Sequence, residues 1–330
     1  MRINSIIVPV IVLIVFALTG GCDDVGVDDG GNVTASKFTV FRTEDGLADN
    51  AVTDVLVDYI RNGVWFTTRS GLSFYSITDS TFVTYGAEYD IPDMEMTSLA
   101  VDYSGTIWAG TVTGLSSMAP GDTLWTSLPD RDNLVHRYIT SLAPVGFSLW
   151  IGTKGGISIR NPDGWKSYVS ELGFSSEVTS VAEDTNGNVW VGSTDGIAVL
   201  ADSVWKYYDA PTLPTTYINT IYADIGGSIW VGTSSIASLY QNGTWKNYGP
   251  ADGLPATGIN TFKRDKFGVL WAGTNSGVYY FINDKWINFA IPSDITGPPV
   301  RAIDSDQRTG TMWFGTDQGV LRYEPSTLVN

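Results

Sequence analysis

The sequence predicts an all-β fold, a seven-bladed β-propeller with four-stranded antiparallel blades whose last blade is closed by the N-terminal strand. Three observations lead to this prediction. A tryptophan motif occurs seven times, the copies contain short strand-like runs in a constant order, and a pattern missing from the last copy occurs at the start of the domain. Short strands repeated about every 40 residues are typical of propeller blades.

The repeat is marked by a tryptophan that is followed, in six copies, by an apolar residue, glycine, and threonine or serine. Successive tryptophans lie 43, 42, 40, 40, 41 and 42 residues apart. This regular spacing predicts a structural role, with each indole packed between neighbouring blades. The seven blade tryptophans are Trp65, Trp108, Trp150, Trp190, Trp230, Trp271 and Trp313.

The other elements of each unit follow in order. A short apolar strand precedes the tryptophan, and a turn such as Asp184 to Gly187 joins the two. An aspartate side chain and a glycine with positive φ both favour such a turn. A glycine six residues after the tryptophan opens a third strand in six copies, and an aromatic run forms the fourth strand.

The seventh unit shows three of these strands, and its fourth is predicted at the other end of the domain. Phe38 to Phe41 has the aromatic spacing of a fourth strand, and Phe41 precedes Trp65 by 24 residues, as Phe289 precedes Trp313. We therefore expect the N-terminal strand to complete the last blade. Ring closure would cover the sheet edges that an open array exposes.

Residues 1–21 predict a secretory signal peptide. Arg2 precedes an apolar run at residues 6–18, and small residues lead to Cys22. The run is too short for a stable membrane span. It resembles a bacterial lipoprotein signal, which implies that Cys22 is lipidated, although Thr19 replaces the usual leucine. An ordinary secretory signal with a chance cysteine is the alternative. Residues 22–36 predict a disordered acidic tether, and residues 37–330 the propeller.

Composition limits the chemistry. The formal net charge is −16, and the chain has one cysteine and one histidine. Nucleic acid is therefore an unsuitable partner, a disulfide framework is excluded, and a histidine metal cluster is excluded. We expect no cofactor and no metal site, because the calcium-loop-like run that starts at Asp184 recurs as a turn in other blades. His136 is expected to be an exposed or locally bonded loop residue.

The unit from Glu44 to Tyr75 resembles the two-component-regulator propeller repeat. Its Asp-Gly-Leu signature occurs at residues 45–47 and again at residues 252–254. The resemblance implies the propeller of an extracytoplasmic sensor region, and many such regions respond to glycans. No kinase or immunoglobulin-like segment follows the propeller in this sequence. We therefore expect a sensor-like binding module without a signalling domain of its own.

A ring of residues is predicted around the mouth of the central channel, at the second position of each first strand. Hydroxyl and amide groups with one arginine suit a polar, sugar-like or carboxylated ligand. The alternative is that small polar residues simply fit the crowded inner strands. The ring consists of Thr53, Thr97, Thr140, Thr179, Asn219, Asn260 and Arg301, with Arg137, Tyr138 and Tyr217 in the adjoining loops.

The loops between blades hold 14 acidic residues and three arginines. This imbalance predicts a negative potential that favours cations or a basic partner. We expect a monomeric domain in the bacterial cell envelope, facing the periplasm or the cell surface. It would bind a glycan or an envelope protein, and only the lipid anchor would contact the membrane. No catalytic residue is predicted; the alternatives are a polysaccharide lyase or hydrolase, and an envelope-complex scaffold. Candidate aromatic platforms are Tyr89, Tyr138, Phe174 and Tyr217.

Overall fold

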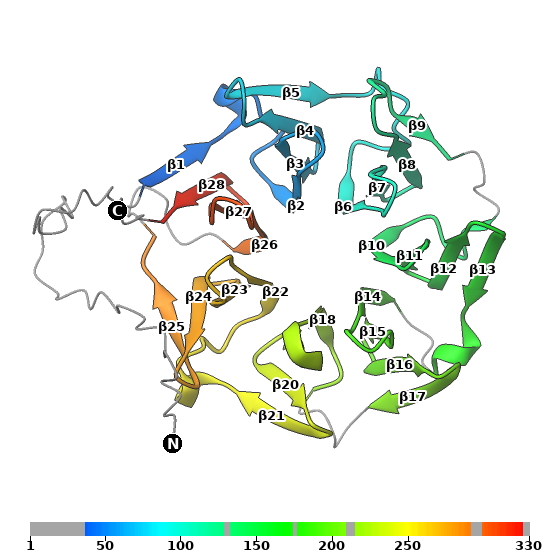
Figure 1. Ribbon diagram of the computed structural model, residues 1–330, viewed down its shortest axis with the longest axis vertical. Helices are drawn as coiled ribbons and strands as arrows, with labels where there is room; N and C mark the ends of the chain where they lie inside the picture. The colour runs from blue at the N-terminus through cyan, green and yellow to red at the C-terminus, as the bar shows by residue number, and fades with distance from the viewer. Residues whose placement is uncertain (1–36, 129–132, 174–176, 209–214, 292–298, 326–330) are drawn as a thin grey trace, which may run out of the picture. The chain divides into compact units, whose positions relative to one another are not determined.

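A computed structural model describes residues 37–128, 133–173, 177–208, 215–291 and 299–325. The described residues form seven four-stranded antiparallel sheets, arranged as blades around a central axis (Figure 1). The prediction of a seven-bladed propeller is confirmed, and Lys37–Pro325 cluster as one compact unit. Cys22, the signal segment and the tether lie outside the described residues and stay predictions.

In each blade the first strand lies nearest the axis and the fourth lies outermost (Figure 1). The first strands are β2 (Val52–Asp58), β6 (Met96–Val101), β10 (Ile139–Val145), β14 (Val178–Glu183), β18 (Ile218–Ala223), β22 (Ile259–Arg264) and β26 (Val300–Ser305). The second strands are β3 (Gly63–Thr68), β7 (Ile107–Thr111), β11 (Ser148–Thr153), β15 (Val189–Ser193), β19 (Ile229–Thr233), β23 (Leu270–Thr274) and β27 (Met312–Thr316).

The outer half of each blade is built from two further strands. The third strands are β4 (Gly71–Ser76), β8 (Leu115–Met118), β12 (Gly156–Asn161), β16 (Ile197–Ala201), β20 (Ala237–Gln241), β24 (Gly277–Ile282) and β28 (Gly319–Glu324). The fourth strands are β5 (Thr81–Tyr85), β9 (Thr126–Ser127), β13 (Gly164–Tyr168), β17 (Val204–Tyr208), β21 (Thr244–Tyr248), β25 (Lys285–Phe289) and β1 (Lys37–Phe41). Short 3-10 helices in the described chain are η1 (Thr43–Asp45), η3 (Ser170–Leu172), η4 (Ile225–Gly227) and η5 (Pro250–Asp252).

The N-terminal strand closes the ring, as predicted. Strand β1 pairs antiparallel with β28, and Phe41 lies opposite Val320. The ring of Phe41 lies 6.0 Å from Trp313 in the last blade and 5.1 Å from Tyr75 in the first. One aromatic side chain therefore contacts both blades that meet at the closure.

The blade tryptophans are buried between blades, as predicted. Each is at most 6% exposed, and Trp190 packs with Ile218 and Ile221 of the next blade. Gly192 follows Trp190 at a point of close approach between blades. A Cβ on Gly192 would lie 2.7 Å from Cγ2 of Ile218, so a larger residue would force the blades apart.

The aspartate of the turn also holds the tryptophan, a role that the sequence reading missed. Asp184 accepts a hydrogen bond from Nε1 of Trp190 at 3.0 Å, and the same bond links Asp58 to Trp65, Asp102 to Trp108 and Asp265 to Trp271. Asp184 also accepts from the backbone N–H groups of Asn186 and Asn188. The carboxylate therefore satisfies the turn and the buried indole together.

The antiparallel order gives the ring two faces. In the described chain, the loop face carries the connections between blades, at residues 42–51, 86–95, 128, 133–138, 169–173, 177, 215–217, 249–258, 290–291 and 299. The turn face carries the turns between the first and second strands, at residues 59–62, 102–106, 146–147, 184–188, 224–228, 265–269 and 306–311. In the part of the chain that the structure describes, no helix has the length and apolar character of a membrane span.

A polar cavity at the propeller axis

A bulge near the start of each first strand shapes the centre of the propeller. In every described blade the pairing between first and second strands shifts register between the first and third residues, as between Val178 and Ser180 in β14. A bulge bends a strand and redirects its side chains. The second and third residues of most first strands consequently border one central cavity.

The cavity has a volume of about 270 Å³. Its walls are almost wholly polar, and Leu142 and Ala302 are the apolar members among the described lining residues. Six of the seven predicted ring residues border it. The lining consists of Asp54, Thr97, Ser98, Thr140, Ser141, Leu142, Thr179, Ser180, Asn219, Thr220, Asn260, Thr261, Arg301 and Ala302.

Several ring residues connect neighbouring blades. Asn219 donates from Nδ2 to the carbonyl of Ile259 at 3.0 Å, and Asn260 donates to the carbonyl of Val300 at 3.0 Å. The Thr140 hydroxyl donates to the carbonyl of Val178 in the same way. The structural alternative for these positions therefore has direct support.

Thr53 is the seventh predicted ring residue, and it is not among the described residues that line the cavity. Its hydroxyl is 2.8 Å from Oγ1 of Thr67 and 2.9 Å from the carbonyl of Met96. These contacts hold the side chain against its own blade and the next one. Asp54, the following residue, borders the cavity in this blade.

The third position of the first strand was missed by the sequence reading, which considered only the second. Oδ2 of Asp54 accepts from the backbone N–H of Leu99 at 2.8 Å, and the Ser180 hydroxyl accepts from that of Ile221 at 2.9 Å. The alignment of the repeats could have revealed this position, because its members are small and polar in six blades.

Three hydroxyl groups of the cavity wall have no hydrogen-bond partner among the described residues. They belong to Thr97, Ser98 and Thr179, and Ser98 is only 6% exposed. Buried polar groups are almost always hydrogen-bonded in native proteins. These three oxygens are themselves covered by neighbouring atoms, so a polar molecule in the cavity would meet the other hydroxyl and amide groups of the wall first.

Asp54 is the carboxylate of this lining. Burial raises its pKa to about 7, although hydrogen bonds from the backbone N–H groups of Leu99 and Val55 oppose the shift. A carboxyl group with this pKa changes its protonation state near neutral pH. As an acid it donates one hydrogen bond, and as an anion it only accepts.

Arg301 is the cationic residue of the lining, and it is already paired. Its Nε and NH2 groups donate to the two carboxylate oxygens of Asp317 at 3.0 and 2.9 Å. This bidentate geometry neutralises the guanidinium locally. The pairing weakens the expectation of a carboxylated ligand and leaves hydroxyl and amide groups as the main features of the wall.

The predicted loop residues do not border the cavity. Lys154 lies 4.0 Å from the ring centre of Tyr138, and Tyr217 is 49% exposed. His136 is exposed, beside the exposed Arg137, and accepts from the backbone N–H of Tyr138 at 3.0 Å, as expected for a loop histidine. Tyr89 packs edge-on against Tyr85 rather than forming an open platform. Phe174 lies outside the described residues.

Fold and cavity together define a seven-bladed propeller with a polar axial pocket. Residues 173–195 and 212–235 match the sequence model of the Two component regulator propeller family. The chain therefore carries repeats of this family, and the resemblance seen in the sequence is confirmed. No curated protein matches the sequence.

Solved structures share the fold at low sequence identity. The extracellular domain assigned to the hybrid two component system BT3049 of B. thetaiotaomicron is 22% identical, with a TM-score of 0.74 over 87% of this chain and 41% of that one. The corresponding domain of BT4673 is 17% identical, with a TM-score of 0.72 over 88% and 40%. This chain thus spans about two fifths of these structures.

An enzyme has the same fold. A catalytically inactive histidine-to-alanine variant of virginiamycin B lyase from Staphylococcus aureus, solved with quinupristin, is 14% identical. Its TM-score is 0.70 over 89% of this chain and 100% of the lyase. At these identities the similarities establish the fold alone, so the function has to be argued from the cavity.

Proposed function

We propose that this chain is an extracytoplasmic, lipid-anchored binding module that takes a glycan end or a single sugar unit into its axial cavity. The polar lining of the cavity carries the proposal, because hydroxyl and amide side chains from five blades border it. The extracytoplasmic setting and the anchor rest on the predicted signal peptide and Cys22.

The chemistry of the wall favours a neutral polyhydroxylated ligand. Hydroxyl and amide groups both donate and accept, which matches sugar hydroxyls. Arg301 is paired with Asp317, so a carboxylate ligand would have to compete for it. Ligand pockets commonly measure about 300–1,000 Å³, and the cavity of about 270 Å³ is slightly below that range. It therefore suits one sugar unit.

Binding is favoured over catalysis. A hydrolase or lyase needs an acid and a base, or an activated nucleophile, within reach of the substrate. Asp54 has a suitable pKa, but both of its oxygens accept backbone N–H bonds, and Arg301 is the other ionisable group of the described lining. A docking scaffold for an envelope protein would instead use the acidic loops and show salt-sensitive association.

The test is to screen the purified full chain against a glycan panel by calorimetry, with mass spectrometry of the glycans for cleavage. Thr220→Val should lower affinity with little loss of stability, because it keeps the shape of a side chain that borders the cavity and removes its hydroxyl group. Tyr217→Ala is the control, because it removes an exposed aromatic ring outside the cavity. Cleavage would contradict the binding module, and absence of any glycan signal would favour the scaffold.

A further inference from the structure

The turn face carries exposed apolar side chains on five of its seven described turns. The rings of Tyr103 and Phe147, from neighbouring blades, meet edge to face at 4.7 Å and are left open on the outside. In the described part of the loop face, the large exposed hydrophobic residues are Val169 and Tyr217. The exposed residues of the turn face are Tyr59, Ile60, Tyr103, Phe147, Ile225 and Phe267, each 45% to 70% exposed.

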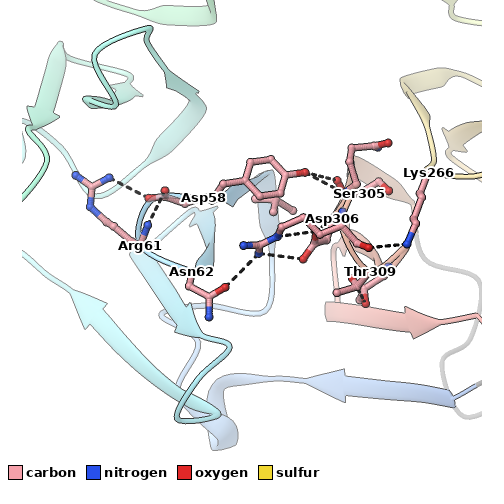
Figure 2. Close-up of polar contacts among 12 residues, drawn as sticks. Asp58, Arg61, Asn62, Lys266, Ser305, Asp306 and Thr309 are labelled. Atoms are coloured by element: carbon pink, nitrogen blue, oxygen red, sulfur yellow. Dashed lines mark hydrogen bonds and ion pairs between the residues drawn. The ribbon is translucent and has the colours of Figure 1, made fainter.

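In these turns most acidic side chains are buried, whereas two basic side chains are exposed. The aspartates point inward, where they hold tryptophan indoles or arginines; Asp58 is 1% exposed and Asp306 is 2% exposed. Lys266 and Arg308 are exposed at the adjoining turns of blades six and seven. Figure 2 shows this region. Lys266 donates a hydrogen bond to the backbone carbonyl of residue 308, and Asp306 forms an ion pair with Arg308.

The turns therefore present mainly apolar and cationic groups to the outside. Glu183, at the end of β14, is an exposed acid beside one of these turns. The other exposed acids of this side lie in the turns between third and fourth strands, at the rim of the ring, and include Asp79, Asp122, Asp163, Asp202 and Asp284. Aromatic rings combined with Lys and Arg are typical of protein surfaces at a membrane–water boundary.

The path of the chain points to the same side. Lys37 pairs with Glu324 at the end of β28, and the neighbouring β27 begins at Met312, directly after the turn at residues 306–311. The described chain thus enters the propeller at the edge that carries the turn face. Fourteen residues, 23–36, lie between the predicted anchor Cys22 and Lys37, and even a fully extended segment of that length reaches only about 50 Å.

We propose that the turn face docks on a lipid bilayer surface and that the loop face, with its cavity, points away from the membrane. The orientation rests on the proposed lipid anchor at Cys22, while the lipid affinity of the turn face rests on its own side chains. The proposal departs from the expectation that the anchor alone contacts the membrane. The acidic loop face fits this arrangement, because anionic headgroups repel it.

The experiment uses the full-length lipoprotein in vesicles of phosphatidylethanolamine and phosphatidylglycerol. Cys22 is the chain's one cysteine. When lipid occupies its thiol, an introduced cysteine is the single site that a thiol-reactive fluorophore can label. Phe147→Cys and Phe267→Cys place an environment-sensitive fluorophore on the turn face, and Tyr217→Cys is the matched loop-face control. Turn-face labels should shift to shorter wavelength and be quenched by brominated lipid, whereas the control label should show neither change.

A second variant tests the side chains themselves. Replacing Tyr103, Phe147, Ile225 and Phe267 by serine should abolish quenching of a label at Tyr59→Cys, while the anchor keeps the protein on the vesicles. Equal quenching on both faces, quenching only on the loop face, or protection of the turn face by a co-purifying protein would each overturn the proposal. Mass spectrometry of Cys22 tests separately whether the anchor is present, and the glycan panel tests whether the cavity binds a sugar. A negative result in either experiment is therefore distinct from a negative result for membrane docking of the turn face.

Discussion

The turn face and the loop face use the same repeated strands for different purposes. On the turn face, aspartates such as Asp184 are buried and fully engaged with backbone N–H groups and an indole. On the loop face, the bulged strand starts leave hydroxyls such as that of Ser98 without a partner. The comparison teaches that four blades use the turn-face aspartate to hold the blade tryptophan, whereas the small polar residues at the loop-face end of the first strands include hydroxyls with no partner among the described residues.

Loss of the closing strand should have the largest effect, because β1 runs between the two faces and supports both. Deleting residues 37–41 exposes the edge of β28 and removes the contacts of Phe41 with Trp313 and Tyr75. The cost should exceed the roughly 3–5 kcal/mol of a single buried aromatic side chain. Thermal unfolding followed by circular dichroism measures it, and a melting curve like that of the full chain would show that β1 is not a closure.

Trp190→Ala should damage packing and leave the cavity chemistry alone. Trp190 is 3% exposed and lies between blades four and five, so the loss should be about 3–5 kcal/mol in the free energy of unfolding. Urea titration measures the loss. If the variant were as stable as the wild type but had lost ligand affinity, Trp190 would be a ligand-binding residue and not a packing residue.

Asp184→Ala should cost about 1–3 kcal/mol, because it leaves the buried Nε1 of Trp190 and the turn N–H groups unsatisfied. Asp195→Ala is the matched control in the same blade. Asp195 is exposed, at the turn between the second and third strands, so its replacement should stay within about 0.5 kcal/mol. Equal losses in the two variants would mean that the turn-face aspartate has no special role.

Most of the fold could be predicted from the sequence, because the tryptophan spacing, the turn glycines and the displaced fourth strand all describe one unit. The axial site was only partly predictable. Six of seven ring residues border the cavity, but the bulge that also turns Asp54 and Ser98 toward it was not predicted, although small polar residues recur at that position in six blades. The partners of Arg301 and Trp190 were missed for a similar reason, since side-chain pairing depends on geometry that periodicity does not specify.

The last prediction separates the two faces by the pH dependence of their stability. Burial raises the pKa of Asp54 to about 7, so between roughly pH 4 and pH 7 the folded chain keeps a proton that the unfolded chain has released. Stability from this group therefore falls as the pH rises through that window. Asp54→Asn stays neutral, and it should abolish a loss of about 2–3 kcal/mol between pH 5 and pH 8.

The control for this last prediction lies on the turn face. Burial opposes ionisation of Asp184, yet hydrogen bonds from Asn188 and Trp190 outweigh it and lower the pKa of that carboxyl. Asp184 is therefore ionised across pH 5 to pH 8, and Asp184→Asn should lower stability by the same amount at both ends. Urea unfolding at the two pH values measures both variants. If Asp54→Asn kept the wild-type pH dependence, the near-neutral titration would belong to another group, and the loop-face cavity would have no pH-sensitive acceptor for its ligand.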